Sequence, residues 1–314
     1  MDNENLIEIA QKMLSAYFDK PFSVTRLSMG NANANHVVVC DSAKYFFRIY
    51  LPVKDFPRKL EELETEIKIT DWFSNKGFPV ARVIKSLAGD TITCSDDYYG
   101  ALFNFLAGQH AYGNLREIHF EAIGKLMAEV HTATEQNKLI CEKRWEQGNF
   151  WLRIYTKVEK NKNILQIEDI KKKKKIETLA DKLNKIPQYL IHGDYHFGNV
   201  LFDENAKISG LLDFDDYRMG HFMDDLVRSF VCELVYTPKE YYKLKQDYVH
   251  SFFRGYTEKR KISKEELELI PIYLDLHYLS SLIAVTKRTP QRVNEFKEDL
   301  AKLKNWIYNE ISGN

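Results

Sequence analysis

The chain has 314 residues, with 45 Lys and Arg against 45 Asp and Glu, and 44% of its residues are hydrophobic. The neutral charge balance argues against a general nucleic-acid-binding or membrane-surface protein, which would carry an excess of basic residues. The sequence contains no run of about 18 apolar residues that could cross a membrane. The acidic start MDNENLIEIA lacks the order of a signal peptide, and four cysteines at 40, 94, 141 and 232 form no CxxC pair. We therefore expect a cytoplasmic protein with reduced thiols, without nucleic-acid or membrane partners, and long enough for two domains or one two-lobed fold.

Short β-type runs and turns fill the first hundred residues. The predicted strands there are residues 22–27, 37–40, 45–50, 91–94 and 98–106. An Asn-rich turn at 30–35 separates the first two strands, and residues 41–44 join the second to the third. Apolar residues at helical spacing predict a helix over 58–75, which Gly77 and Pro79 end.

After Gly108 the chain is predicted to be mostly helical. Apolar residues at helical spacing predict a core helix over 118–136, and the chain is helical again from residue 222 onward. A β island at 189–216 interrupts the helices. The Lys-rich stretch 171–175 is interpreted as a solvated face or loop, with a phosphate-binding patch as the alternative. The expected architecture is a small β-rich lobe and a larger helical lobe.

The residues that could carry chemistry concentrate in the β island. Asp194 follows an apolar strand, Asn199 lies at the mouth of a hairpin centred on 203–207, and the return strand ends at Asp213. Such a hairpin would bring the three side chains around one point. Amide and carboxylate oxygens suit Mg²⁺, which bridges phosphates, and they do not suit zinc. A carboxylate beside that ion can orient an attacking hydroxyl, so the pattern indicates phosphoryl transfer.

The order and spacing of these residues are those of kinases. The sequence resembles the aminoglycoside phosphotransferase and choline kinase superfamily, whose pattern H-G-D-x-H-x-x-N, followed by a strand and D-[FW]-x-[DE], is met at 192–199 and 213–216. The resemblance implies an α+β, protein-kinase-like two-lobed fold. It implies a nucleotide-binding lobe over 1–103, a hinge over 104–110 and a catalytic and substrate lobe over 111–314. It also implies an ATP-dependent O-phosphotransferase that uses ATP and Mg²⁺.

The resemblance extends to the nucleotide side of the site. Arg48 stands where the family carries the strand Lys or Arg that pairs the nucleotide phosphates, and Glu66 occupies the position of its ion-pair partner. Asn104 and Phe105 lie in the segment that looks like the hinge, whose backbone would meet adenine.

The nucleotide loop departs from the protein-kinase pattern. It has a single glycine, Gly30, with Asn31, Asn33 and Asn35 where protein kinases use G-x-G-x-x-G. Asn tolerates positive φ better than most residues, and its amide can donate to phosphate. We therefore still expect this segment to form the nucleotide-binding loop. A surface Asn-rich turn without a ligand is the alternative.

On this interpretation Asp194 positions and deprotonates the acceptor hydroxyl, while Asn199 and Asp213 hold Mg²⁺ against the phosphates. Asp225, in the Asp-Leu that follows the metal loop, is expected to brace the catalytic loop through backbone hydrogen bonds. His131 is interpreted as a packed histidine and not as a catalyst.

The acceptor is expected to be a small hydroxylated molecule. Only eleven residues separate Asp213 from Asp225, and no A-P-E sequence follows, so the chain lacks the peptide platform of protein kinases. Asp215 and Asp216 could meet a cationic group such as an amine, although both could instead cap the next turn or touch a second Mg²⁺. Tyr273 and His277 share a helical face and could contact the acceptor, with a core stripe as the alternative.

Two other functions stay open at this point. A nucleotide-binding pseudokinase would explain the Asn-rich loop and the Arg at 48, and a protein Ser/Thr kinase of the same superfamily would keep the chemistry and change the acceptor. The sequence names no acceptor, does not separate ATP from GTP, and leaves monomer and homodimer both open.

Overall fold

The computed structural model describes residues 3–27, 33–52, 59–95, 97–111, 114–137, 151, 154, 178, 183–236, 244–286 and 290–312. The chain divides into two compact units, Met1–Gly108 with Ser209–Leu212, and Gln109–Ile208 with Asp213–Asn314. Gly30, Asn31, Cys141 and the Lys-rich stretch 171–175 lie outside the described residues. Within the described part, no helix has the length and apolar character needed to cross a membrane.

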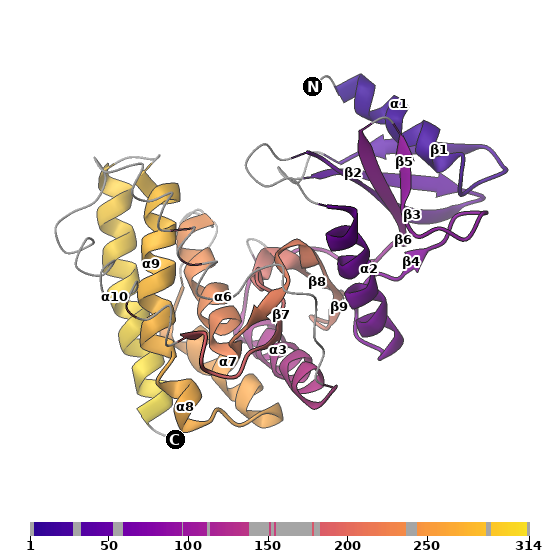
Figure 1. Ribbon diagram of the computed structural model, residues 1–314. Helices are drawn as coiled ribbons and strands as arrows, with labels where there is room; N and C mark the ends of the chain where they lie inside the picture. Colours follow the sequence, from indigo (N-terminus) through magenta and orange to yellow (C-terminus); the bar gives the residue numbers. More distant parts are fainter. Residues whose placement is uncertain are drawn as a thin grey trace. The chain divides into compact units, whose positions relative to one another are not determined.

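The first unit is built on an antiparallel sheet with the strand order β1-β2-β3-β6-β4, to which β5 adds by pairing with β6 (Figure 1). Its elements are α1 (Asn3–Leu14), β1 (Phe22–Arg26), β2 (Asn33–Cys40), β3 (Ala43–Tyr50), α2 (Leu60–Asn75), β4 (Val83–Ile84), β5 (Thr93–Ser95) and β6 (Tyr98–Asn104). The predicted strands and the helix over 58–75 are therefore confirmed, with ends that shift by a few residues.

Alternation along β3 divides the side chains of this sheet between its two faces. Phe47 and Ile49 are fully buried in a core cluster with residues of α1, whereas Tyr50 belongs to a second cluster with Leu63 and Ile67 of α2. The two helices thus cover opposite faces of the sheet. Arg48, between Phe47 and Ile49 in the strand, falls on the α2 face.

The hairpin between β2 and β3 is tighter and longer than predicted. Its loop is the pair Asp41 and Ser42, both with positive φ (48° and 65°), as a two-residue hairpin turn of the primed type requires. The prediction of an Asn-rich turn through residue 35 was wrong at its end, because Asn33 and Asn35 already pair with β3. Strand pairing satisfies their backbone groups, and this outweighs the turn propensity of Asn.

A later segment of the chain completes the first unit. Val80 forms a parallel bridge with Leu211, and the backbone N–H of Leu211 donates to the carbonyl of Pro79 at 2.6 Å. The unit therefore contains residues from two parts of the sequence that are separated by a hundred residues of the second unit.

The second unit is mainly helical, as predicted, with short strands between the helices. Its elements are α3 (Glu117–Asn137), β7 (Tyr189–Ile191), η2 (Phe197–Asn199), β8 (Val200–Phe202), β9 (Ile208–Leu211, mostly counted with the first unit), η3 (Phe214–Asp216), β10 (Arg218–Gly220), α6 (Phe222–Tyr236), α7 (Gln246–Lys259), α8 (Lys264–Leu267), α9 (Ile270–Thr286) and α10 (Pro290–Ser312). Strands β7 and β10 pair antiparallel, α3 packs on α7, and α9 lies beside both α6 and α10 (Figure 1).

Helices α3 and α7 approach each other closely through a reciprocal pair of glycines. A Cβ on Gly124 would lie 2.2 Å from the carbonyl oxygen of Phe252, and a Cβ on Gly255 would lie 2.1 Å from that of Glu121. Since backbone atoms cannot move aside as a side-chain tip can, only glycine allows this helix separation.

We expect Gly124→Ala to lower the free energy of unfolding by more than about 3 kcal/mol, because the added methyl group forces the two helices apart. Chemical denaturation would measure the loss. The matched control is Glu129→Ala, a change on the exposed face of α3 that removes only a 3.6 Å ion pair with Lys259. That control should change stability by no more than about 0.5 kcal/mol. Equal stabilities of the two variants would contradict the close approach.

A buried histidine makes the first unit sensitive to acid. His36 on β2 is 0% exposed, and neither ring nitrogen has a hydrogen-bond partner among the described residues. Burial lowers the pKa of His36 to about 4. The folded state therefore holds this ring neutral, whereas the unfolded chain protonates it near pH 6.5.

Between pH 6.5 and 4 the unfolded state binds this proton before the folded state does, so stability falls as the pH falls. The loss from His36 amounts to about 3 kcal/mol over that range. We expect His36→Leu to show a shallower decline than the natural protein when urea denaturation is followed at pH 7, 5.5 and 4.5. Other histidines titrate in both proteins, so the difference between the two curves is the test, and parallel curves would refute the assignment.

Candidate active site

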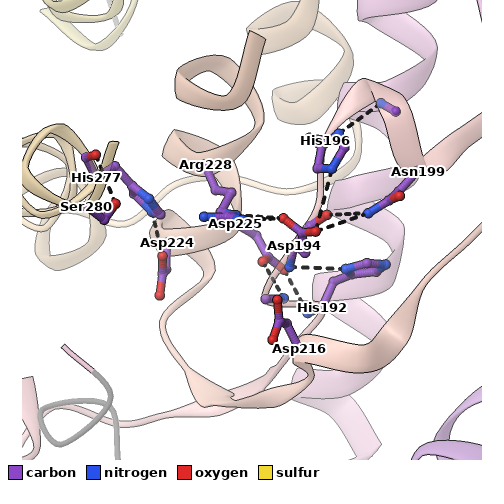
Figure 2. A network of polar contacts seen from close by, with 12 residues as sticks. His192, Asp194, His196, Asn199, Asp216, Asp224, Asp225, Arg228, His277 and Ser280 are labelled. Carbon is purple, nitrogen blue, oxygen red and sulfur yellow. Dashed lines mark hydrogen bonds and ion pairs between the residues drawn. The ribbon is translucent and has the colours of Figure 1, made fainter. Parts of the chain in front are cut away.

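The catalytic-loop pattern predicted at 192–199 follows β7 and ends with η2, and one buried carboxylate holds its backbone. Asp225, in the first turn of α6, is 0% exposed. Its Oδ2 accepts the backbone N–H of His192 and its Oδ1 that of Gly193, both at 2.8 Å (Figure 2). The predicted bracing role of Asp225 is confirmed.

His131 lies behind this brace and is packed as predicted. The ring is fully buried and stacks on Phe222 with 4.3 Å between centroids. Its Nδ1 is 2.9 Å from the hydroxyl of Tyr256, and its Nε2 is 3.5 Å from Oδ2 of Asp225. Burial lowers the pKa of His131, although Asp225 opposes the shift. Through these contacts the His131 ring supports Asp225, which holds the catalytic loop. Because the ring is fully buried, it has no access to a substrate.

Gly193 forms the sharpest point of the loop. Its φ is +84°, and a Cβ at this position would lie 2.0 Å from the carbonyl oxygen of Asp216. The buried guanidinium of Arg218 joins the same two segments, because its Nη1 donates to the carbonyl oxygens of Gly193 and Asp216, each at 3.1 Å. The catalytic loop and the segment after Asp213 are thereby fixed to one another.

Asp194 and Asn199 are brought together, as their spacing predicted. The Nδ2 of Asn199 donates to the backbone carbonyl of Asp194 at 2.9 Å and lies 3.5 Å from its Oδ2 (Figure 2). The amide oxygen of Asn199 therefore points away from the carboxylate. The amide oxygen, which is the atom of this side chain that a hard cation prefers, is therefore not occupied by Asp194.

An arginine that sequence reasoning missed completes the surroundings of Asp194. Both Nε and Nη2 of Arg228, on α6, donate to Oδ1 of Asp194, at 2.8 and 2.5 Å. The Nε2 of His196 lies 3.6 Å from Oδ2. Burial alone would raise the pKa of the Asp194 carboxyl, but Arg228 and His196 hold it well below its usual range. The one available signal was the position of Arg228, three residues after Asp225 and thus on the same helical face.

Asp213 ends the hairpin in a strained conformation. The hairpin itself is confirmed, since the backbone N–H of Asp203 donates to the carbonyl of Lys207 at 2.8 Å between the arms β8 and β9. Asp213 has φ 64° and ψ 69°, in the left-handed region that non-glycine residues rarely adopt. Strained backbone of this kind is typical of functional positions. Here the left-handed conformation changes the direction of the chain between β9 and η3.

Asp215 and Asp216 follow on η3, where Asp215 is half-buried and Asp216 is exposed. In the described ranges, no three His, Cys, Asp or Glu side chains gather as metal ligands. The predicted metal ligands Asn199 and Asp213 would supply only two oxygens, and phosphate and water would complete the shell of Mg²⁺.

In the first unit, Arg48 and Glu66 form the predicted ion pair. Nη1 of Arg48 lies 3.5 Å from Oε1 of Glu66, and the two residues are only 9% and 3% exposed. The guanidinium also lies 5.8 Å from the centroid of the Phe46 ring. Asn35 is opposite Arg48 in the β2–β3 register, so the two residues are cross-strand neighbours.

The predicted hinge residues differ in their surroundings. The side chain of Asn104 accepts the backbone N–H of Arg82 at 2.5 Å, and the backbone N–H of Asn104 donates to the carbonyl of Arg82 at 3.0 Å. Asn104 therefore ties the end of β6 to the segment before β4. Phe105 is exposed, with the ammonium group of Lys44 5.9 Å from its ring centroid. Asn33, from the nucleotide loop, is buried at the start of β2.

Tyr273 and His277 lie in the interior of the second unit. They are 0% and 1% exposed, and His277 Nε2 is 2.7 Å from Oδ1 of Asp224, whose Oδ2 accepts Nη2 of Arg218 at 2.7 Å. The hydroxyl of Tyr273 lies 2.5 Å from Nδ1 of His221. These contacts match the core-stripe alternative.

The comparisons with known proteins agree with this geometry. Residues 23–260 match the family described as "Phosphotransferase enzyme family". The chain belongs to this family. It is therefore a phosphotransferase, and the enzyme class predicted from the β island is confirmed.

Two curated relatives are kinases. The chain is 24% identical over 267 residues to an amicoumacin kinase of Bacillus subtilis (strain 168), covering 78% of this chain and 75% of that protein. It is 23% identical over 219 residues to a homoserine kinase of Caulobacter vibrioides (strain NA1000 / CB15N), covering 66% of each.

A solved structure shows the same fold. The amicoumacin kinase hAmiN, in complex with AMP-PNP, Ca²⁺ and Ami, matches 96% of this chain and 94% of its own with a TM-score of 0.73 at 19% identity. The predicted α+β, protein-kinase-like fold, with a β-rich N-terminal lobe and a larger helical C-terminal lobe, is confirmed.

We expect Gly193→Ala to lower the free energy of unfolding by more than about 3 kcal/mol. Alanine disfavours the positive φ of this position, and its methyl group would also collide with the backbone of Asp216. Gly89→Ala is the matched control: Gly89 has φ +96°, but nothing lies within 4 Å of its added Cβ. It should cost only the strain, about 1–2 kcal/mol. Denaturation curves that place both variants at the same stability would show that the loop can yield.

Proposed function

We propose that this phosphotransferase moves the γ-phosphate of ATP to a hydroxyl of a small, amine-bearing molecule, with Mg²⁺ as the metal. The observation that carries the proposal is the fixed pair of Asp194 and Asn199, in a loop whose backbone is held by Asp225. Asp213, in its strained conformation at the end of the following hairpin, would supply the second metal ligand.

In the proposed reaction the acceptor oxygen bonds to the γ-phosphorus as the bond from phosphorus to the β,γ-bridging oxygen breaks. ADP leaves with that electron pair, and the hydroxyl proton passes to Asp194. Because Arg228 and His196 lower the pKa of Asp194, its carboxylate is a weak base whose main contribution is to orient the hydroxyl. A loose transition state needs little deprotonation before the phosphoryl group moves, so a weak base is sufficient.

Asn199 and Asp213 would hold Mg²⁺, since both offer hard oxygen donors and the amide oxygen of Asn199 points away from Asp194. When bound, the ion neutralises charge on the nucleotide phosphates. Carboxylate and amide side chains fit this ion, and the chain carries them in the kinase order.

The nucleotide would be bound by the N-terminal lobe, residues 1–103, and the hinge, 104–110. Arg48, held by Glu66 at 3.5 Å, would pair the α- and β-phosphates, and its planar fork suits two phosphate oxygens at once. The Asn33 and Asn35 side chains would complete the phosphate contacts, and the backbone at Asn104 and Phe105 would meet adenine. The bound analogue AMP-PNP in the amicoumacin kinase supports an adenine nucleotide.

Two observations favour a small amine-bearing acceptor over a protein. Only η3, β10 and the first turn of α6 lie between Asp213 and Asp225, which leaves no segment for a peptide platform. The homoserine kinase relative and a structural neighbour, a microcompartment-associated aminopropanol kinase, are named for small molecules that carry both an amine and a hydroxyl. Asp215 and the exposed Asp216 would meet the ammonium group of such an acceptor.

The test is ADP release from Mg-ATP across amino alcohols, amino sugars and aminoglycosides. We expect acceptor-dependent release that Asp194→Asn lowers by about 10²–10⁴-fold, because the hydroxyl loses the group that orients it and takes its proton. Asp247→Asn, the same change at an exposed position on α7, is the control and should keep full activity. Nucleotide binding without turnover on any acceptor would favour a pseudokinase, and labelled phosphate on protein alone would favour a protein kinase.

A further inference from the structure

The two oxygens of the Asp194 carboxylate have different surroundings. Oδ1 receives two N–H groups from one guanidinium, Nε of Arg228 at 2.8 Å and Nη2 at 2.5 Å. Among the described residues, the contacts of Oδ2 are longer, 3.5 Å to Nδ2 of Asn199 and 3.6 Å to Nε2 of His196. Figure 2 shows Arg228 on one side of the carboxylate and Asn199 with His196 on the other. One oxygen is thus fixed and the other is more open to an incoming hydroxyl.

We propose that Arg228 is a positioning residue for phosphoryl transfer, which clamps Oδ1 of Asp194 so that Oδ2 faces the acceptor hydroxyl. This inference rests on the proposed function. A planar guanidinium that makes two hydrogen bonds to one oxygen restricts rotation of the carboxylate far more than a single contact would. Since hydroxyl orientation supplies much of the catalysis in such a reaction, a freely rotating carboxylate would lower the turnover rate.

Helix α6 gives the clamp a rigid base. Asp225 in its first turn holds the backbone of the catalytic loop, and Arg228, three residues later, holds the side chain of the same loop. The loop therefore has its main chain and its reactive carboxylate anchored to one helix. A shift of α6 would therefore move the loop backbone and the Asp194 carboxylate together and keep their relative geometry.

The other charged or titratable groups near the clamp leave the ion pair intact. His196 faces Asp194 from its own loop, Asp216 faces both partners from η3, and Cys232 faces Arg228 from the next turn of α6. From α9, the buried His277 also faces Arg228. Burial raises the pKa of the Cys232 thiol to about 12, so that neighbour stays neutral and Arg228 keeps its charge for the carboxylate.

The experiment is a double-mutant cycle on the active enzyme, with Arg228→Met measured alone and combined with Asp194→Ala. Alone, Arg228→Met should lower kcat by about 10²–10³-fold and change the KM for ATP by less than about 3-fold. In the Asp194→Ala background, where no side-chain oxygen is left for Arg228 to hold, it should change kcat by less than about 2-fold. Arg228→Lys should recover part of the loss, because an ammonium can reach Oδ1 but cannot form the planar pair.

Arg292→Met is the matched control, since this arginine donates to the carbonyl of Leu234 at 2.5 Å, at the far end of α6. It should keep the natural kcat. Thermal unfolding of every variant checks the fold, and if Arg228→Met does not fold, Arg228→Gln and Arg228→Lys replace it in the cycle. Equal losses in both backgrounds, a loss confined to KM, or an unchanged kcat would overturn the inference while leaving the proposed function standing. An inactive natural enzyme would instead overturn the proposed function, and the inference with it.

Discussion

The buried carboxylate of Asp225 is the contact on which the arrangement of the site depends. It accepts two consecutive backbone N–H groups from the loop that carries Asp194. These groups lie in a turn after β7, outside the regular backbone pairing of a helix or strand, so leaving them unpaired in the interior would be costly. The position of Asp225 at the start of α6 also stabilises its negative charge through the helix dipole. One interaction therefore meets the needs of the loop and of the helix.

A second buried charge extends this anchoring to the segment after the hairpin. Arg218 is 1% exposed, and its donors reach the carbonyls of Gly193 and Asp216 and the carboxylate of Asp224. His277 on α9 occupies the remaining oxygen of Asp224. A buried guanidinium is tolerated only where its donors find acceptors, and here each acceptor belongs to a different segment. The catalytic loop, η3, α6 and α9 are consequently joined by hydrogen bonds of buried polar side chains.

Much of the fold and part of the site could be predicted from the sequence because their signals are local. Hydrophobic periodicity and turn residues predicted α3, the β2–β3 hairpin and the β8–β9 hairpin. The spacing of Asp194, Asn199 and Asp213 predicted phosphoryl transfer. The partners of buried polar groups are set by tertiary contacts, so Arg228 and Arg218 had no comparable signal. The same limit explains Tyr273 and His277: a shared helical face does not say whether that face meets a ligand or a neighbouring helix. At Asn33 and Asn35, residue propensity indicated a turn, and strand pairing decided otherwise.

The bridge between Val80 and Leu211 has a consequence for biosynthesis. Residues 209–212 belong to the first unit, although they are translated after a hundred residues of the second. On the ribosome, the sheet and helices of residues 1–108 emerge well before the segment that completes them, and domains usually fold as they emerge. The edge at Pro79–Val80 must therefore wait for a distant partner, which raises the contact order and slows the last step of folding. A nascent chain halted near residue 150 would therefore hold an incomplete N-terminal unit, because residues 209–212 would not yet have been synthesised.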